Sequence, residues 1–422
     1  MVTSDGGGSQ AGNGEKPSSG WPAAGPGPGG HQTSADLARS FFSDEPDEEM
    51  PDADGNPLSR LFAAIDPVSD SAMTYFYGHL FAIEPQARAM FPPAMDAQRR
   101  RFYQALTRIA ASADNVGQLS RYLEGLGRAH RKFGVQKEHF DAFRQALAAT
   151  WQRYAPAVWT DAAAAAWEDL FGRATRAMIG AAERDAKQSP PWWLAEVVAH
   201  EPRGDDLALL TLLPSQPVPY QPGQHISIQT PRWPRLWRNY SVANAPRDDG
   251  TLTLHVRAVP GGLVSAALVH HVTAGDTLLL GAAAGAMTAD IRSERDVLCL
   301  AGGTGLAPIK AIIEAVIAAP GTGRRREIVL YYGARREAAL YDLAGLQQME
   351  LKYPWLQVLP VVSEEAAPDA IFGSVPDVVG LSSWRGRDIY VAGPDAMIAR
   401  TVSELKDRGA PEESIHYDCP LF

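Results

Sequence analysis

A histidine stands in line with apolar residues in the segment QLSRYLEGLGRAHRKFG, which runs from Gln118 to Gly134. Read as a helix, the segment places five residues on one stripe, spaced four, three, four and three apart: Leu119, Leu123, Leu126, His130 and Phe133. Gly134 is a suitable helix stop. An imidazole aimed at an apolar interior is either a hydrogen-bonded core histidine or an axial ligand of a haem iron, which requires a neutral imidazole. The segment alone leaves both readings open.

Four short segments in the C-terminal half carry groups that bind phosphates and flat ring systems. In Arg238-Asn239-Tyr240-Ser241, the arginine can hold a phosphate, the tyrosine can cover a flat ring and the serine can hydrogen-bond its edge. Gly261-Gly262-Leu263-Val264-Ser265 offers bare backbone and a helix start to a pyrophosphate. Two further segments occupy strand-to-helix turns: Ala301-Gly302-Gly303-Thr304-Gly305 and Ala392-Gly393-Pro394-Asp395-Ala396-Met397. Each is weak evidence by itself, because glycine-rich turns are common.

Length and composition limit the classes of protein. The chain has 422 residues, of which 45% are hydrophobic and 21% charged, which is typical of a globular protein with two or three domains. The net charge of −10 and the lack of a long basic run argue against nucleic-acid binding. The two cysteines, Cys299 and Cys419, are too far apart in sequence to suggest a disulfide framework or a thiolate zinc site. We expect no signal peptide and no membrane span, with the cytoplasm as the default location.

The chain divides by pattern into four parts. Residues 1–45 are rich in Gly, Ser, Pro, Ala and acidic residues, and we expect a disordered tail. Residues 46–188 show only helical periodicity, which predicts an all-α domain with helices near 67–83, 94–113, 118–133, 137–154 and 160–186.

The remaining two parts contain strands. Residues 189–290 hold short β-rich runs between Gly and Pro turns, which predicts a small antiparallel barrel. In residues 291–422 strands alternate with helices near 306–318, 342–352 and 395–408, which predicts a parallel, doubly wound sheet. The expected fold class is therefore multidomain: all-α, then β-barrel, then α/β.

The four glycine- and arginine-containing segments, in this order and on these elements, resemble the ferredoxin-NADP reductase-like family over residues 192–422. The resemblance implies two bound cofactors. FAD would be held by Arg238, Tyr240, Ser241, Gly261, Gly262, Val264 and Ser265. NAD(P)H would be held by Gly302, Gly303, Thr304, Gly305, Gly393, Pro394 and Met397.

The chain departs from that family at two places. Many relatives have a cysteine beside the nicotinamide, and this chain has Ala392. Relatives usually place an aromatic residue over the flavin near the C-terminus, where this chain has Pro420 followed by Phe422.

The helical part resembles the globin domain of the flavohaemoglobins, and the fused arrangement resembles that whole family over nearly all of residues 58–422. The resemblance rests on Tyr75–Phe81, Glu84-Pro85, Phe91, Asp96–Arg99 and His130–Phe140. It implies a haem b with His130 as the proximal ligand, Phe91 packed on the haem, and Tyr77 and Gln98 on the distal side. The helical pattern supports the distal position of Gln98 independently, because Gln98 begins an apolar stripe with Phe102, Ala105 and Ile109. Otherwise Tyr77 would be a core-edge tyrosine and Gln98 a helix-start glutamine.

The proximal side departs from the flavohaemoglobin pattern. Relatives typically bond the proximal histidine to a tyrosine and a glutamate, which raises its basicity. Those positions fall on Phe140 and Ala182, with Glu183 one residue along and turned away. The lysine that often precedes the histidine is Ala129. We therefore expect a weaker electron push from the histidine.

The resemblance implies a nitric oxide dioxygenase, in which NAD(P)H reduces FAD, FAD reduces the haem, and nitric oxide reacts with dioxygen to give nitrate. The alternatives are an NAD(P)H-dependent flavin and haem reductase with another acceptor, and an oxygen- or redox-sensing globin. The reductase segments favour an enzyme over a sensor. Arg335-Arg336 could grip the 2′-phosphate of NADPH or be solvated, so NADH and NADPH both stay possible. We expect small-molecule partners only, and a monomer or weak dimer.

Overall fold

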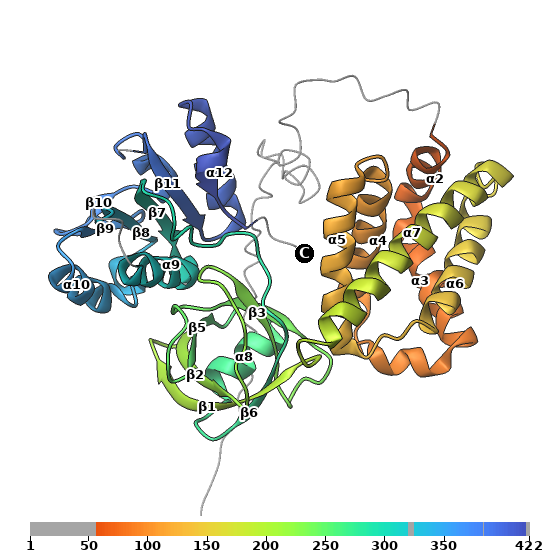
Figure 1. Cartoon of the computed structure of the whole chain (residues 1–422), viewed down its shortest axis with the longest axis horizontal. Helices are drawn as coiled ribbons and strands as arrows, with labels where there is room; N and C mark the ends of the chain where they lie inside the picture. The colour runs from red at the N-terminus through yellow and green to blue at the C-terminus, as the bar shows by residue number, and fades with distance from the viewer. Residues whose placement is uncertain (1–55, 320–324, 383, 419–422) are drawn as a thin grey trace, which may run out of the picture. The chain divides into compact units, whose positions relative to one another are not determined.

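A computed structural model describes residues 56–319, 325–382 and 384–418. The expected tail at residues 1–45, together with Cys419, Pro420 and Phe422, lies outside these residues. Within them three successive parts are seen: helices, an antiparallel sheet with one helix, and a parallel sheet with helices on both faces (Figure 1). The expected fold class is confirmed.

The helical part contains α2 (Pro57–Ile65), α3 (Ser69–Ile83), α4 (Asp96–Ala111), α5 (Val116–His130), α6 (His139–Tyr154) and α7 (Asp161–Ala186). Side-chain caps fix several helix starts: Asn56, Asn115 and Thr160 each accept a hydrogen bond from a backbone N–H in the first turn. Gly134 ends the turn after α5 with φ of 74°, a left-handed conformation that glycine adopts without strain.

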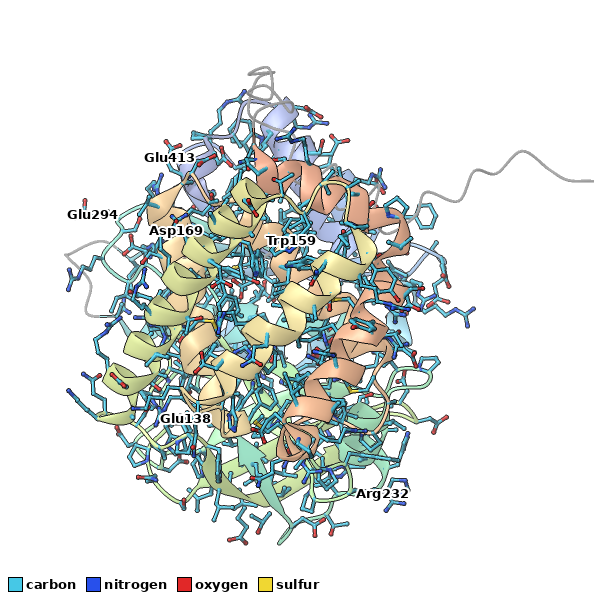
Figure 2. All side chains as sticks on the ribbon, turned by 90° about the vertical axis from the view of Figure 1, so that its right-hand side faces the viewer. Glu138, Trp159, Asp169, Arg232, Glu294 and Glu413 are labelled. Carbon is cyan, nitrogen blue, oxygen red and sulfur yellow. The ribbon has the colours of Figure 1, made fainter. Side chains whose placement is uncertain are left out.

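A single apolar core joins these helices. Its largest fully buried side chains include Phe76, Trp151 and Trp167. Trp159, labelled in Figure 2, packs against this core from the segment before α7. Packing of these large aromatic side chains holds α3, α6 and α7 in place. It thereby also fixes the positions of the other side chains on these helices.

The second part is a six-stranded antiparallel sheet, β4-β3-β6-β1-β2-β5, whose strands surround α8 (Leu263–His270) (Figure 1). The strands are β1 (Trp193–Pro202), β2 (Leu207–Pro214), β3 (His225–Gln229), β4 (Arg238–Ser241), β5 (Leu252–Arg257) and β6 (Thr277–Leu280). An isolated bridge between Val242 and Leu254 brings the two edge strands together, so the sheet nearly closes into a barrel.

The third part is a parallel sheet of order β10-β9-β8-β7-β11-β12. Its strands are β7 (Asp296–Gly302), β8 (Ile328–Ala334), β9 (Leu356–Val362), β10 (Ile371–Phe372), β11 (Arg387–Ala392) and β12 (Ile415–His416). Alternate residues of β7 face opposite sides: Val297 and Cys299 pack with α9 (Leu306–Ala318) and α10 (Leu343–Lys352), whereas Leu298 and Leu300 pack with α11 (Val375–Val378) and α12 (Asp395–Asp407). From β7 the following strands β8, β9 and β10 are added on one side, whereas β11 and β12 lie on the other side. Ligands of such sheets bind at the strand ends where this change of direction occurs.

No helix among the described residues combines the length and the apolar character needed to cross a bilayer.

Candidate functional site

His130 is the last residue of α5, and its ring is partly buried. Its Nδ1 atom lies 2.7 Å from the carbonyl oxygen of Leu126, one turn earlier. Burial lowers the pKa of His130, so the imidazole is neutral near pH 7 and Nδ1 donates to that carbonyl. Nε2 then carries the lone pair, and it has no hydrogen-bond partner among the described residues. A neutral imidazole with a free Nε2 is what an axial haem ligand requires.

A close helix contact positions α5. A Cβ added to Gly127 would lie only 2.2 Å from the backbone oxygen of Met178 on α7, so only glycine permits this approach of the two backbones. Arg131, next to His130, pairs with Asp185 of α7 and donates to the carbonyl of Ser189 at 2.7 Å. Contacts before and after His130, at Gly127 and at Arg131, therefore fix the end of α5.

Tyr77 on α3 and Gln98 on α4 meet inside the helical part. The Gln98 Nε2 atom donates to the Tyr77 hydroxyl at 3.3 Å. Tyr77 is 4% exposed, and burial raises its pKa well above the ordinary value, so the hydroxyl keeps its proton. The sequence did not draw attention to Arg101, whose Nη2 lies 3.4 Å from the Gln98 Oε1. A cation three residues after a glutamine on one helix is the signal that could have suggested it.

Apolar side chains surround this pair. The ring of Phe91 lies 5.3 Å from that of Tyr77, and the ring of Phe102 lies 5.7 Å from it. Phe91, Phe102 and Leu126 pack against the core yet remain only partly buried. Apolar side chains that remain partly open in the same core cluster fit a haem, which would cover them.

The proximal departures are visible in the structure. Phe140 and Ala182 offer no hydrogen-bonding side chain, and Glu183 is exposed. Among the described residues, the Leu126 carbonyl is the sole partner of the His130 Nδ1 atom. The histidine is thus oriented by a neutral backbone group and not by a carboxylate.

A cavity of about 1100 Å³ joins the barrel and the parallel sheet. It brings together many residues that the sequence singled out: Tyr240, Ser241, Gly302, Gly303, Thr304, Gly305, Gly393, Pro394 and Met397. Asn239 and Ala392 also line it. A flat ring at Tyr240 and a nucleotide at the glycine turns would therefore share one cavity.

Two of the glycines allow the turns after β7 and β11 to touch. A Cβ on Gly302 would lie 2.4 Å from the sulfur of Met397, and one on Gly305 would lie 2.3 Å from the backbone oxygen of Ala392. The start of α9 can consequently approach the end of β11 closely. Exposed N–H groups at a helix start attract a pyrophosphate, so this contact shapes a nucleotide site.

The structure does not bring five other sequence-selected residues to the cavity lining: Arg238, Gly261, Gly262, Val264 and Ser265. The Ser265 hydroxyl donates to the Gly262 carbonyl at 3.2 Å and accepts from the Val259 N–H, so it shapes the turn itself. Arg238 is exposed and donates to the Trp237 carbonyl. Val259 and Pro260, just before the glycines, line the cavity.

Sequence reasoning missed His225 and Asp418, which also line the cavity. The His225 Nδ1 lies 3.7 Å from Asp418 Oδ2, and Asp418 Oδ1 accepts from the N–H groups of Ala286 and Met287. Burial opposes ionisation of Asp418, but these hydrogen bonds outweigh it and lower its pKa. The residues stand 193 positions apart (418 − 225), so no local pattern pairs them.

Lys132 links the two functional regions and was also missed. Two residues after His130, its Nζ donates to Ser227 Oγ of β3 at 2.8 Å and lies over the ring of Trp237. Burial lowers the pKa of Lys132 to about 8. A contact from the histidine segment to the barrel gives the helical part a direct connection to the reductase part.

Comparison with known proteins assigns a class to each part. Residues 74–178 match the globin family, residues 196–288 match the oxidoreductase FAD-binding domain, and residues 299–403 match the oxidoreductase NAD-binding domain. The reductase component of the naphthalene 1,2-dioxygenase system of Pseudomonas putida is 32% identical over 230 residues, which are 53% of this chain and 67% of that protein.

Two further relatives cover different shares of the chain. The electron transfer component of the xylene/toluene monooxygenase of Pseudomonas putida is 29% identical over 231 residues, 50% of this chain, and the match spans 61% of that relative. The solved flavohaemoglobin of Malassezia yamatoensis, with bound FAD and haem, has a TM-score of 0.69 and 18% identity over 85% of this chain and 98% of its own. This last likeness is one of fold.

The chain therefore belongs to the family of FAD- and NAD(P)-dependent ferredoxin reductases, and it carries a globin domain ahead of that module. It is an NAD(P)H-dependent oxidoreductase with domains for haem, FAD and NAD(P). Its fold is similar to that of the solved flavohaemoglobin over most of the chain.

Proposed function

We propose that this chain is a nitric oxide dioxygenase that converts nitric oxide and dioxygen to nitrate with electrons from NAD(P)H. The observation that carries the proposal is the hydrogen bond between Tyr77 and Gln98, placed in a globin domain that is fused to its own reductase. A protonated hydroxyl and an amide in an apolar site are suited to stabilise the partial negative charge that dioxygen gains on reduction.

In the globin domain, His130 would hold the haem, whose iron supplies the centre where dioxygen and nitric oxide combine. Burial raises the pKa of Tyr77, so its hydroxyl keeps its proton and would be able to donate to a bound ligand at physiological pH. Gln98 orients that hydroxyl from α4. With a haem in place, the aromatic side chains around the pair would exclude water, which would strengthen both polar interactions.

In the reductase, FAD would supply the conversion of a two-electron hydride into single electrons. Tyr240 and Ser241 line the cavity, where the tyrosine ring would cover the flavin ring and the serine would hydrogen-bond its edge. The turns at Gly302–Gly305 and Gly393–Met397 would hold NAD(P)H in the same cavity. The proposed donor and acceptor of the hydride would thus share one cavity.

One observation favours a second candidate, an NAD(P)H-dependent reductase that delivers electrons to another acceptor. Within the described part of the chain, the partner of the His130 Nδ1 atom is the Leu126 carbonyl, which gives less electron push than a carboxylate. The two Pseudomonas putida relatives named above are a reductase component and an electron transfer component of oxygenase systems.

The deciding experiment uses the full chain loaded with haem and FAD. Nitric oxide loss is recorded at an electrode in air with NADH and then with NADPH, and nitrate is quantified. We expect rapid loss, with one electron used per nitric oxide. His130→Ala loaded with FAD alone serves as the control: it should keep electron transfer to a dye and lose nitric oxide consumption. Decay no faster than in the cofactor-free protein would reject the dioxygenase, and fast NADH oxidation without nitric oxide would favour the second candidate.

A further inference from the structure

Arg101 completes a row of three polar side chains within the helical part. Its Nη2 atom lies 3.4 Å from the Gln98 Oε1, and the Gln98 Nε2 lies 3.3 Å from the Tyr77 hydroxyl oxygen. Gln98 and Arg101 stand three positions apart on α4, so they lie on the same face of that helix. Arg101 is partly buried there, whereas Arg100, one residue earlier, is exposed. The row therefore runs from Arg101 on α4 through Gln98 to Tyr77 on α3.

The chemistry of arginine decides which way the Gln98 amide faces. A guanidinium has only donors, so it requires the oxygen end of the amide, and the NH2 end must then face Tyr77. Among the described residues no carboxylate pairs with Arg101, whereas Arg99 pairs with Asp70 and Asp96. Within that part of the chain, the Gln98 oxygen is the acceptor that Arg101 uses.

This orientation leaves the hydroxyl hydrogen of Tyr77 for a ligand. Because the hydroxyl oxygen accepts from Gln98, its own hydrogen requires a different acceptor. The neighbouring rings of Phe81, Phe91 and Phe102 supply no oxygen or nitrogen, and no second partner of the hydroxyl is found among the described residues. Tyr77 is 4% exposed, and a buried donor without an acceptor is costly. With the amide reversed, the hydroxyl would donate to Gln98 and its hydrogen would be unavailable to a ligand.

We propose that Arg101 is a positioning residue, which holds the Gln98 amide so that the Tyr77 hydroxyl donates its hydrogen to bound dioxygen. The inference rests on the proposed function, which places haem and dioxygen beside Tyr77. A direct effect of charge is the alternative that a test has to separate. Burial raises the pKa of Tyr77, and the positive charge of Arg101 opposes part of that rise, so this charge also acts on the site without the amide.

The test follows oxygen release and the C–O stretch of the carbon monoxide complex in the reduced full chain loaded with haem and FAD. Oxygen release is measured by stopped-flow mixing with carbon monoxide, and the C–O stretch by infrared spectroscopy. Arg101→Met should speed oxygen release roughly twofold to tenfold, the effect of losing one hydrogen bond. It should also raise the C–O stretch, because a donor near the ligand oxygen weakens that bond. Arg101→Lys keeps a donor and should restore most of both values.

Arg100→Met is the matched control, because it removes the same charge from an exposed position on the same helix. It should leave oxygen release and the C–O stretch unchanged. In a Gln98→Leu background, Arg101→Met should have little effect, because no amide is left to orient. Equal acceleration with and without Gln98 would assign the effect to charge and overturn the proposal. An unchanged Arg101→Met, or an equal effect in Arg100→Met, would also overturn it.

Tyr77→Phe separates failure of this inference from failure of its premise. Faster oxygen release in Tyr77→Phe together with an unchanged Arg101→Met would overturn the role of Arg101 alone. Oxygen release unchanged in Tyr77→Phe would remove the tyrosine from the distal site, and with it both the inference and the distal site of the proposed dioxygenase. None of these measurements involves nitric oxide or turnover.

Discussion

The Nδ1 atom of His130 lies 2.7 Å from the Leu126 carbonyl oxygen, so the proposed haem ligand is oriented by the backbone of its own helix. A backbone carbonyl is a neutral acceptor. It fixes the tautomer and the ring orientation, but it adds less basicity to the imidazole than a carboxylate would. We therefore expect the globin domain to bind ligands without strongly activating the O–O bond.

The first prediction concerns proximal basicity. The iron–histidine stretch of the ferrous haem protein should lie below that of a peroxidase, and peroxidase activity should be low, because no carboxylate contacts His130 among the described residues. The double variant Phe140→Tyr/Ala182→Glu should raise both. Resonance Raman spectroscopy measures the stretch. A wild-type stretch as strong as a peroxidase's would show that another proximal partner exists.

His130→Ala should abolish haem binding, since the variant lacks the neutral Nε2 that the structure leaves available. Haem content is measured by the pyridine haemochrome method. His139→Ala is the matched control, because His139 lies on the next helix and its Nδ1 accepts the Gln136 N–H. Normal haem content in His130→Ala would refute the assignment, and added imidazole should restore haem to His130→Gly.

Tyr77→Phe should weaken oxygen binding by removing a buried donor hydroxyl. Loss of one buried hydrogen bond costs on the order of 1–3 kcal/mol, which is roughly 5- to 150-fold in affinity. Oxygen affinity of the reduced full chain, measured by flash photolysis, should fall accordingly, and Gln98→Ala should give a smaller loss of the same kind. An oxygen affinity unchanged in Tyr77→Phe would remove the hydroxyl from the distal site.

Arg238→Ala should lose FAD while haem stays bound, because a pyrophosphate would be left without its cation. The flavin content of the purified full chain, measured by absorbance after denaturation, checks this. Arg232→Ala is the control: Arg232 is an exposed arginine a few residues earlier, labelled in Figure 2. Stoichiometric FAD in Arg238→Ala would place the pyrophosphate elsewhere, in line with the position of Arg238 outside the cavity lining.

His255 should make the reductase less stable in mild acid. It is 5% exposed, its Nδ1 lies 2.8 Å from the Tyr341 hydroxyl, and burial lowers its pKa from 6.5 to about 3. Below pH 6.5 the unfolded chain binds a proton that the folded chain refuses, so stability present above pH 6.5 is lost as the pH falls toward 3.

At pH 5 this loss amounts to about 2 kcal/mol, from about 1.5 pH units at 1.4 kcal/mol each. Urea unfolding followed by flavin fluorescence at pH 7.5 and pH 5 measures it. His255→Gln should flatten the dependence, whereas the exposed His271→Gln should leave it unchanged. A His255→Gln variant that loses as much stability as the wild type would assign the dependence to other groups.

Local patterns in the sequence were sufficient for the class of each part. The period of about 3.6 residues around His130 arises because one face of α5 is buried. The continuous apolar run of β7 arises because both faces of that strand are buried. Gly302 and Gly305 signalled the turn, because a side chain at Gly302 would meet the Met397 sulfur and one at Gly305 would meet the backbone of Ala392. These features depend on neighbours within a few residues, so they can be read without coordinates.

Tertiary structure alone decided how distant groups meet. Tyr77 and Gln98 come from different helices, His225 and Asp418 from opposite ends of the reductase, and Arg335 and Glu364 from adjacent strands. The sequence selected Ser265 as a ligand, but its hydroxyl is used within its own turn. The Leu126 carbonyl carries no side-chain signature at all, because every residue has that group and only helix geometry aims it at His130. Side-chain pairing across elements depends on register and packing, which residue type and spacing do not specify.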